Sequence, residues 1–313
     1  MREIKLLQRI QHNNIVSMIE IVMAQPPDTD VLLAFEYMEH DLSGLLHHAC
    51  RKAFFSFEVV TLIGYQIAKG LHYLHNVAGV VHRDMKCSNI LVGRNGVVKL
   101  ADFGLAKEYF NPYAAKLDTD HDDFLIKSAN SGRIGFMTNR VITLWYRPPE
   151  ILLGSEKYGP AVDLWGLGCI LVEMILGQPA FPGVDEISQI ESILIGLHAE
   201  QPNAEEPLSF FRSYPWYGYV PEALVKFKLA SGQPSLRQRL VGACCPDEML
   251  DLILALLHFE PEKRMMTRDV FGMRVFSQLS CTQATATLAA LIESSEFAQL
   301  ECKSAATKKQ TPG

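Results

Sequence analysis

The stretch that decides the fold is Val81-His82-Arg83-Asp84-Met85-Lys86-Cys87-Ser88-Asn89. It carries a carboxylate, an ammonium group and an amide within six residues of one another. Asp84 can accept the proton of a hydroxyl group, and Lys86 can stabilise a phosphate. Asn89 offers the kind of oxygen that Mg²⁺ prefers. These are the groups that phosphoryl transfer needs from a protein, namely an aligned nucleophile and cations that neutralise the moving charge.

A second motif follows in Asp102-Phe103-Gly104, and a third lies downstream in Tyr146-Arg147-Pro148-Pro149-Glu150. Asp102 adds another hard oxygen ligand for Mg²⁺. The pairing of H-R-D-x-K-x-x-N with D-F-G is the signature of a protein kinase. The alternative, that these are ordinary polar loop residues, has about one chance in a hundred.

Composition limits the other classes of function. The chain has 313 residues, of which 48% are hydrophobic, and a formal net charge of −6 without a basic block, so we expect no direct nucleic-acid binding. The seven cysteines lack metal-ligand spacing and fit a reduced intracellular protein. The charged N-terminus has no signal-peptide core, and the most apolar stretch, Leu164 to Leu176, is too short to span a bilayer.

Hydrophobic periodicity predicts both helices and strands. The resemblance of the motifs to those of a protein kinase implies an α+β, protein-kinase-like bilobal fold with a truncated small lobe and a mainly helical large lobe. We predict a partial small lobe over residues 1–38, a large lobe over 39–279, and a C-terminal helix with a disordered tail over 280–313. The expected helices cover residues 1–9, 57–75, 161–177, 185–197, 247–258, 267–275 and 282–301. The expected strands cover residues 15–23, 31–37, 89–92 and 97–100, and residues 200–238 are expected to be irregular.

A long insertion is expected in the segment over residues 107–137. Its middle, residues 116–135, has four Asp and few large apolar residues, so we predict a largely disordered insertion. The acidic run over residues 118–123 could suggest a metal site, but it lacks the glycine and the distal glutamate of a calcium loop. A solvated charge run is favoured by about ten to one.

Residues 1 to about 279 resemble a cyclin-dependent kinase, most closely the transcription-associated members. The resemblance lies in Arg2-Glu3-Ile4-Lys5-Leu6-Leu7, in residues 35–46 (FEYMEHDLSGLL) and in residues 138–150 (TNRVITLWYRPPE). The L-W-Y-R-P-P-E form and the missing Thr-x-Tyr pair speak against a mitogen-activated kinase. The resemblance implies the cofactors ATP and Mg²⁺, a cyclin subunit, Ser/Thr-Pro substrates and a nuclear location, with a cytoplasmic pool also open.

The same resemblance implies roles for residues of the nucleotide cleft. Glu36 and Met38 would offer backbone groups to adenine, and Phe35 would guard the back of the pocket. Val16 and Leu91 would sandwich the base, Asp41 could reach the ribose, and Asn89 and Asp102 would hold the metal. Simple core packing is also compatible with the apolar members. Thr143 would hydrogen-bond both Asp84 and Lys86, which joins the catalytic loop to the activation segment.

Thr138 matches the family's activating phosphothreonine, which a separate activating kinase would modify. A phosphate needs cations to order the loop around it, and the matching positions are Arg2, Arg83 and Lys107. Since the family usually has Arg at the last position, Lys107 would supply a point charge. The alternative, an ordinary exposed Thr138, has about one chance in five.

Four residues match structural positions of the family. Glu150 and Arg264 would form a buried ion pair, and Asp163 would anchor the catalytic loop through backbone amides. Glu3 would pair with a strand lysine, but this sequence has neither that lysine nor a Gly-x-Gly-x-x-Gly loop in a suitable context.

Two functions therefore stay open. The first is a cyclin-dependent Ser/Thr kinase, whose substrates by resemblance include the RNA polymerase II C-terminal repeats. The second is an N-terminally truncated, catalytically weak or inactive fragment that binds a cyclin or a substrate. For the chain as written we expect weak ATP affinity and little phosphotransfer, because half of the nucleotide clamp is missing.

Overall fold

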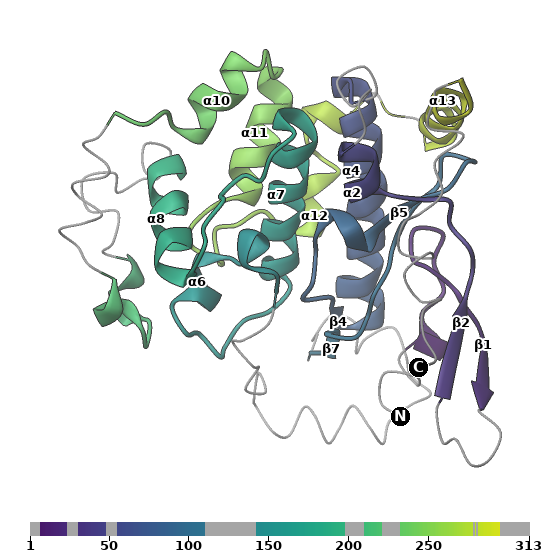
Figure 1. The fold of residues 1–313 in the computed structure, drawn as a ribbon, viewed down its shortest axis with the longest axis horizontal. Helices are drawn as coiled ribbons and strands as arrows, with labels where there is room; N and C mark the ends of the chain where they lie inside the picture. Colours follow the sequence, from purple (N-terminus) through teal and green to yellow (C-terminus); the bar gives the residue numbers. More distant parts are fainter. Residues whose placement is uncertain are drawn as a thin grey trace, which may run out of the picture.

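The computed structural model describes residues 7–23, 31–47, 55–109, 142–197, 210–220, 232–277, 279 and 281–294 (Figure 1). Several predicted features lie outside these residues: Arg2, Glu3, Thr138, the insertion over residues 116–135 and the C-terminal tail. Of the first predicted helix, residues 7–9 are described, and they are helical.

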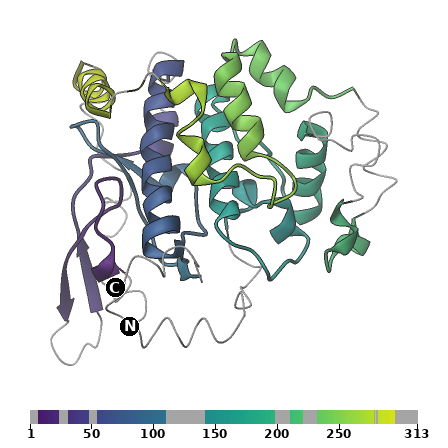
Figure 2. The ribbon, with the colours of Figure 1, turned by 180° about the vertical axis from the view of Figure 1, so that it is seen from behind.

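The small lobe contributes an antiparallel pair of strands, β1 (Met18–Met23) and β2 (Val31–Phe35), which pair from Met18 opposite Phe35 to Met23 opposite Val31. Both strands are shorter than predicted. Ile15 forms only an isolated bridge with Leu100, because the backbone there bonds to the large lobe instead. Figures 1 and 2 show this pair at one side of the molecule and helices α8 and α10 at the other.

The large lobe contains a three-stranded sheet. Its order is β3 (His40–Asp41), β5 (Ile90–Val92) and β6 (Val98–Leu100), with Ile90 opposite Leu100. A second pair joins β4 (Val80–Val81) to β7 (Lys107–Glu108). Because β4 and β5 flank the stretch from His82 to Asn89, these pairings fix both ends of the catalytic loop.

Helices form the rest of the large lobe. The long ones are α4 (Phe57–Tyr73), α7 (Ala161–Leu176), α8 (Glu186–Leu197), α11 (Asp247–Leu256) and α13 (Cys281–Ser294). The short ones are α2 (Leu42–Leu46), α6 (Pro149–Leu152), α10 (Leu236–Gly242) and α12 (Thr267–Val270). Short 3₁₀ turns cover residues 87–89, 144–146, 210–213, 217–219 and 274–276.

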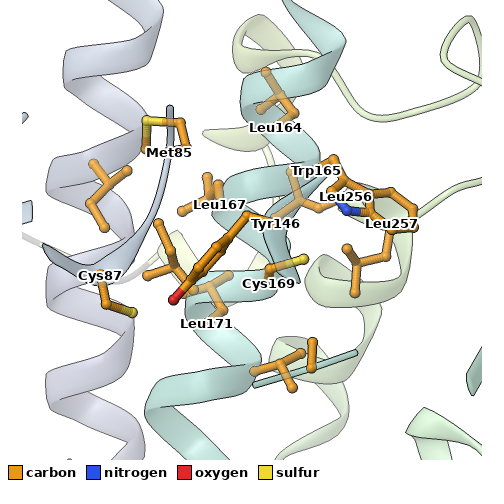
Figure 3. Packing of buried hydrophobic residues seen from close by; sticks show 14 of the residues in the cluster. Met85, Cys87, Tyr146, Leu164, Trp165, Leu167, Cys169, Leu171, Leu256 and Leu257 are labelled. Carbon is orange, nitrogen blue, oxygen red and sulfur yellow. The ribbon is translucent and has the colours of Figure 1, made fainter. Parts of the chain in front are cut away.

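Helix α7 is the centre of the large lobe. Nearly every residue from Ala161 to Met174 is buried, which fits its apolar sequence, and Gly177 ends it in the left-handed conformation (φ 69°). Figure 3 shows its side chains packed between the catalytic loop and α11, with Trp165 and Leu257 on the α11 side. Helix α7 therefore supports the catalytic loop from beneath.

The structure corrects three sequence predictions. The stretch predicted to be irregular, residues 200–238, ends in a helix: Ser235 and Gln238 form a capping box that starts α10. The predicted helix over residues 267–275 is only one α-helical turn, α12, followed by a 3₁₀ turn after Gly272. The α-helical part of α4 ends at Tyr73, and a π-helical turn continues it to Ala78.

The C-terminal helix α13 packs on the turn between β5 and β6. Leu288 and Ile292 of this helix are fully buried. Gly96 in that turn lies so close to α13 that a Cβ atom built on it would be 2.1 Å from the carbonyl oxygen of Thr285. A glycine is therefore required where the helix meets the turn. Within the described ranges, no helix combines the length and apolar character needed to cross a membrane.

Candidate active site

The three polar side chains of the first motif converge on one another. Lys86 Nζ donates to Asp84 Oδ2 at 2.6 Å. Asn89 Nδ2 donates to the carbonyl oxygen of Asp84 at 2.8 Å and to its Oδ2 at 3.1 Å. Asp84 is only 6% exposed and Asn89 5%. The loop therefore holds one carboxylate in a fixed orientation, with a cation and an amide beside it.

The activation segment reaches the same carboxylate from the other side. Thr143 Oγ1 donates to Asp84 Oδ1 at 3.2 Å. Among the described residues no hydrogen bond joins Thr143 to Lys86, so half of the expected contact is present. Each oxygen of Asp84 thus has a separate partner, which leaves little freedom for the carboxylate to rotate.

Three of the four described non-glycine residues with a positive φ lie at this site. They are Arg83 (φ 67°), Asp102 (φ 63°) and Ile142 (φ 69°), and they flank or carry the predicted catalytic groups. Such conformations cost free energy for residues with a Cβ and persist where the surroundings over-determine them. Their concentration here is typical of a functional site.

Asp163 on α7 fixes the start of the catalytic loop. Its Oδ2 accepts the backbone N–H of His82 and its Oδ1 accepts that of Arg83, both at 2.8 Å, and His75 Nε2 lies 2.8 Å from Oδ2. Burial by itself would raise the pKa of Asp163, but the hydrogen bond and charge of His75 outweigh it, so the pKa is lowered. The anchor therefore stays ionised at neutral pH.

His82 connects the catalytic loop to the D-F-G motif. Its Nε2 lies 3.0 Å from the carbonyl oxygen of Ala101, and its ring packs against Phe103 with the centroids 4.9 Å apart. Burial lowers the pKa of this imidazole, which favours the neutral form. The position of Asp102 is thereby set by a contact from the catalytic loop.

Arg83 is buried, and its guanidinium faces the segment after the D-F-G motif. Its Nε donates to the carbonyl oxygen of Leu105 at 2.6 Å and its Nη1 to the hydroxyl of Tyr158 at 3.2 Å. Lys107 lies on β7, opposite Val81 in the β4–β7 pair. The structure therefore brings these two cations to the same end of the catalytic loop, while their predicted partners Arg2 and Thr138 lie outside the described residues.

The connector between the lobes is fixed by an ion pair that sequence reasoning missed. Lys99 Nζ lies 2.7 Å from Glu36 Oε1, and the same oxygen accepts the backbone N–H of Ser17 at 2.6 Å. Burial would raise the pKa of Glu36, but the hydrogen bonds from Lys99 and Ser17 lower it overall. The side chain of Glu36 therefore has a structural role, and its backbone N–H also donates to the carbonyl oxygen of Ser17 at 3.0 Å.

The other predicted nucleotide residues line the same region. Met38 and Val16 are buried, Leu91 is half-buried on β5, and Phe35 is 38% exposed at the end of β2. Val16 donates its N–H to the carbonyl oxygen of Leu100 on β6. Asp41 Oδ1 accepts the N–H of Gly44 at 2.8 Å and caps α2, a role that the sequence reasoning did not assign.

Glu150 and Arg264 form a buried, bidentate ion pair. Nη1 and Nη2 of Arg264 lie 2.8 and 3.0 Å from the two carboxylate oxygens, and the guanidinium stacks 5.0 Å from the centre of the Trp165 ring. Its Nη1 and Nε also donate to the carbonyl oxygens of Ala161 and His258. The pair fastens the end of the activation segment to the base of the lobe.

The donor set fits a magnesium ion shared with a nucleotide. Because Asn89 directs its amide nitrogen at Asp84, its amide oxygen is the atom available to a cation. The carboxylate of Asp102 is exposed. Within the described ranges no group of three or more His, Cys, Asp or Glu could hold a metal alone. Two hard oxygens suit Mg²⁺, which completes its shell with water and phosphate oxygens.

Sequence reasoning missed three further contacts of the site. His75 binds Asp163, Lys99 binds Glu36, and Arg147 donates to the carbonyl oxygen of Ile142 from Nε at 3.2 Å and Nη2 at 3.0 Å. No local pattern identifies His75 or Lys99, because both act across long sequence separations. Arg147 stands inside the Y-R-P-P-E motif, and its position could have been singled out.

Comparison with known proteins agrees with this geometry. The model of the protein kinase domain family matches residues 1–276. Cyclin-dependent kinase C-1 of Oryza sativa subsp. japonica is 35% identical over 290 residues, which cover 88% of this chain and 49% of that protein. Cyclin-dependent kinase 9 of Homo sapiens is 36% identical over 282 residues, which cover 88% of this chain and 68% of that protein.

Two further similarities are to proteins that are named as CTD kinases. CTD kinase subunit alpha of Schizosaccharomyces pombe is 46% identical over 192 residues, 61% of this chain and 28% of that protein. A chain in the crystal structure of the yeast RNA Pol II CTD kinase CTDK-1 complex matches with a TM-score of 0.68 and 32% identity over 89% of this chain and 81% of that one.

The chain spans about half the length of the plant kinases that it matches. The family match nevertheless covers most of the chain, and the fold is that of a bilobal protein kinase with a mainly helical large lobe. The chain therefore belongs to the protein kinase family and, within it, to the transcription-associated cyclin-dependent kinases.

Proposed function

We propose that this chain carries the phosphotransfer site of a cyclin-dependent kinase, which transfers the γ-phosphate of ATP to a Ser or Thr hydroxyl. The observation that carries the proposal is the fully partnered carboxylate of Asp84, with Lys86 on one oxygen and Thr143 on the other. A buried carboxylate in a fixed orientation suits a group that must receive one proton from an aligned hydroxyl.

The chemical step follows from these positions. The substrate hydroxyl oxygen forms a bond to the γ-phosphorus while its proton passes to Asp84. The bond from the γ-phosphorus to the bridging oxygen breaks, and ADP leaves with that electron pair. Lys86 stabilises the charge that develops on the transferred group. Asn89 and Asp102 would hold Mg²⁺, which neutralises phosphate charge when it is bound.

A preference for proline after the acceptor residue is supported by the contact between Arg147 and Ile142. The carbonyl oxygen of Ile142 already accepts two hydrogen bonds from Arg147, and Ile142 has a φ of 69°. A substrate residue with a backbone N–H would find this acceptor occupied, and its donor would stay unpaired on binding. Proline has no N–H and avoids this loss.

The finer assignments rest on the relatives. One similar protein is named a CTD kinase subunit, and one similar solved structure is named as the RNA Pol II CTD kinase complex, so we propose the C-terminal repeats of RNA polymerase II as the substrate. The cyclin-dependent relatives support a cyclin subunit as partner and a nuclear site of action. Phosphorylation of Thr138 by a separate kinase, read by Arg2, Arg83 and Lys107, remains a proposal on the sequence.

The decisive experiment replaces Asp84 by Asn, which keeps the size of the side chain and removes the proton acceptor. In the cyclin-bound protein we expect kcat toward a Ser-Pro peptide to fall by about 10²- to 10⁴-fold, with little change in stability. Ser88→Ala, an exposed change in the same loop, is the matched control. Equal activity of the Asn variant and the wild type would refute the assignment.

A second experiment tests the proline preference. The peptides Ser-Pro and Ser-Ala are compared for the wild type and for Arg147→Met, which frees the carbonyl oxygen of Ile142. We expect the wild type to favour Ser-Pro by at least about tenfold and the variant to lose most of that ratio. An unchanged ratio in the variant would show that another contact determines the preference.

A non-catalytic binding module is the second candidate. It is favoured by the exposure of apolar side chains on the β1–β2 sheet, where Leu32 is 60% exposed. In that case Asp84→Asn and Asp102→Asn would leave the cellular role of the chain intact. Loss of that role in both variants would exclude the binding module.

A further inference from the structure

A buried polar cluster next to the catalytic loop takes no part in the mechanism described above. It comprises the thiol of Cys87, the hydroxyl of Tyr146 and the carboxylate of Glu173, and the three residues are 1%, 6% and 8% exposed. Polar groups are costly to bury, so a cluster of three among apolar side chains requires an explanation.

A hydrogen bond joins two members of the cluster, and the third lies beside them. The hydroxyl of Tyr146 donates to Glu173 Oε2 at 2.5 Å. Figure 3 shows the hydroxyl end of Tyr146 directed toward the sulfur of Cys87. Burial and the neighbouring Cys87 and Glu173 raise the pKa of Tyr146, so its hydroxyl stays protonated at neutral pH. The buried carboxylate of Glu173 therefore has a neutral donor in this hydroxyl.

The three residues come from three different elements. Cys87 follows Lys86 in the catalytic loop, Tyr146 ends the turn that begins after Thr143, and Glu173 lies on α7. Thr143 binds Asp84 and so already joins the segment over residues 142–147 to the catalytic loop. The cluster is a second link between the same two segments. Helix α7 provides the rigid side of that link.

We propose that Cys87, Tyr146 and Glu173 position the peptide-binding segment over residues 142–147 against the catalytic loop. Cys87 and Tyr146 are thus positioning residues for the protein substrate. This inference rests on the proposed function and adds the contact that aligns the substrate with Asp84. Cys87 shares the 3₁₀ turn over residues 87–89 with Asn89. No hydrogen bond that the structure describes joins the side chains of the cluster to Glu36, Asn89 or Asp102, so we expect the cluster to affect ATP binding less than peptide binding.

Kinetics provide the first test, on the cyclin-bound protein. In Tyr146→Phe and Cys87→Ala we expect the peptide KM to rise by about 10- to 100-fold, while the KM for ATP changes less than about twofold. Cys87→Ser keeps a donor and should return the peptide KM close to the wild-type value. Cys169→Ala is the matched control, because Cys169 is equally buried but lies on α7, outside the two segments that the cluster joins.

A merely structural role predicts a different result. Loss of folded protein lowers the apparent kcat and leaves the KM for peptide and the KM for ATP unchanged. Cys87→Ala and Cys87→Ser would then have the same peptide KM. Unchanged peptide KM values, or an equal effect of Cys169→Ala, would overturn the proposal.

Hydrogen exchange gives a second readout that does not need activity. In Tyr146→Phe we expect the amides of residues 86–89 and 142–147 to exchange at least about fivefold faster, with no change on α11. Acceleration confined to residues 142–147 would overturn the inference. A wild type without kinase activity would refute the proposed function alone, and the exchange pattern would still decide whether the cluster couples the two segments.

Discussion

The catalytic loop belongs to the large lobe and the β1–β2 sheet to the small lobe, and the two are stabilised in different ways. Asp84 and Asn89 are nearly buried and each has several short hydrogen bonds to fixed partners. On the β1–β2 sheet, Ile19 and Leu32 expose 67% and 60% of their surface to solvent. The large lobe is therefore rigid through redundant contacts, whereas the described part of the small lobe relies on a single pair of strands.

This contrast shows where single substitutions should matter. A polar group in the large lobe that loses its partner is left buried, and that costs more than the contact contributed. A group on the β1–β2 sheet that loses its partner turns to water. Substitutions in the large lobe should therefore lower the free energy of unfolding more than substitutions on the β1–β2 sheet.

The largest effect is expected for Arg264→Ala. It leaves the carboxylate of Glu150 buried without a cation, and we expect the free energy of unfolding to fall by about 3–5 kcal/mol. The matched control is Arg268→Ala, which removes an exposed ion pair to Asp269 and should cost less than about 1 kcal/mol. Urea denaturation measures both, and equal losses would contradict the contrast.

Gly96→Ala should have the next largest effect. The residue has a φ of 75°, and its new methyl group would collide with the backbone of α13 at Thr285. We expect a loss of about 1–3 kcal/mol and faster hydrogen exchange in residues 281–294. Gly242→Ala serves as control, because a Cβ atom added at this residue would have no neighbouring atom within 4 Å. Undisturbed exchange on α13 in Gly96→Ala would show that the packing tolerates the methyl group.

Lys99→Met tests the connector between the lobes, where the effect should be below about 1 kcal/mol. The pKa of Glu36 is lowered chiefly by Lys99 and Ser17 against the effect of burial. The ionised form therefore stabilises the fold at neutral pH, and this contribution is lost as the pH falls from about 4 through the lowered pKa.

The difference in unfolding free energy between the wild type and Lys99→Met should accordingly be larger at pH 7 than at pH 3. Lys263→Met, which loses the exposed pair with Glu260, controls for the general loss of a lysine. A difference that grows on acidification would contradict the assigned sign.

Leu32→Glu should have the smallest effect. This side chain is already 60% exposed on β2, so we expect a change within about 0.5 kcal/mol. Leu171→Ala, at a fully buried position on α7, should cost about 2–5 kcal/mol under the same conditions. A large loss for Leu32→Glu would mean that this face of the sheet is covered in solution.

Much of the site could be predicted from the sequence because its chemistry lies in short motifs. The spacing of Asp84, Lys86 and Asn89 suffices to bring them together, since one loop of six residues carries all three. Asp163 and the pair of Glu150 with Arg264 could be assigned only by resemblance, because they lie far apart along the chain. Periodicity identified α4, α7 and α11 within a few residues.

The misses have local physical causes. The start of α10 was overlooked because the capping box at Ser235 and Gln238 follows an aromatic and proline-rich stretch that suggests a loop. The helix predicted over residues 267–275 ends early because Gly272 follows its first turn. In both places the residue that decides the outcome was visible, but the average character of the window favoured the other structure.

The sequence by itself determined the chemistry of this protein: a proton acceptor, a phosphate-binding cation and two oxygen ligands at the spacing of a protein kinase. Only the tertiary structure decided how these groups are held. The partners of Glu36, Asp163 and Tyr146 come from distant elements, and packing around α7 selects them. Local residue types fix which reactions are possible, whereas burial across the chain fixes the orientation of each reacting group.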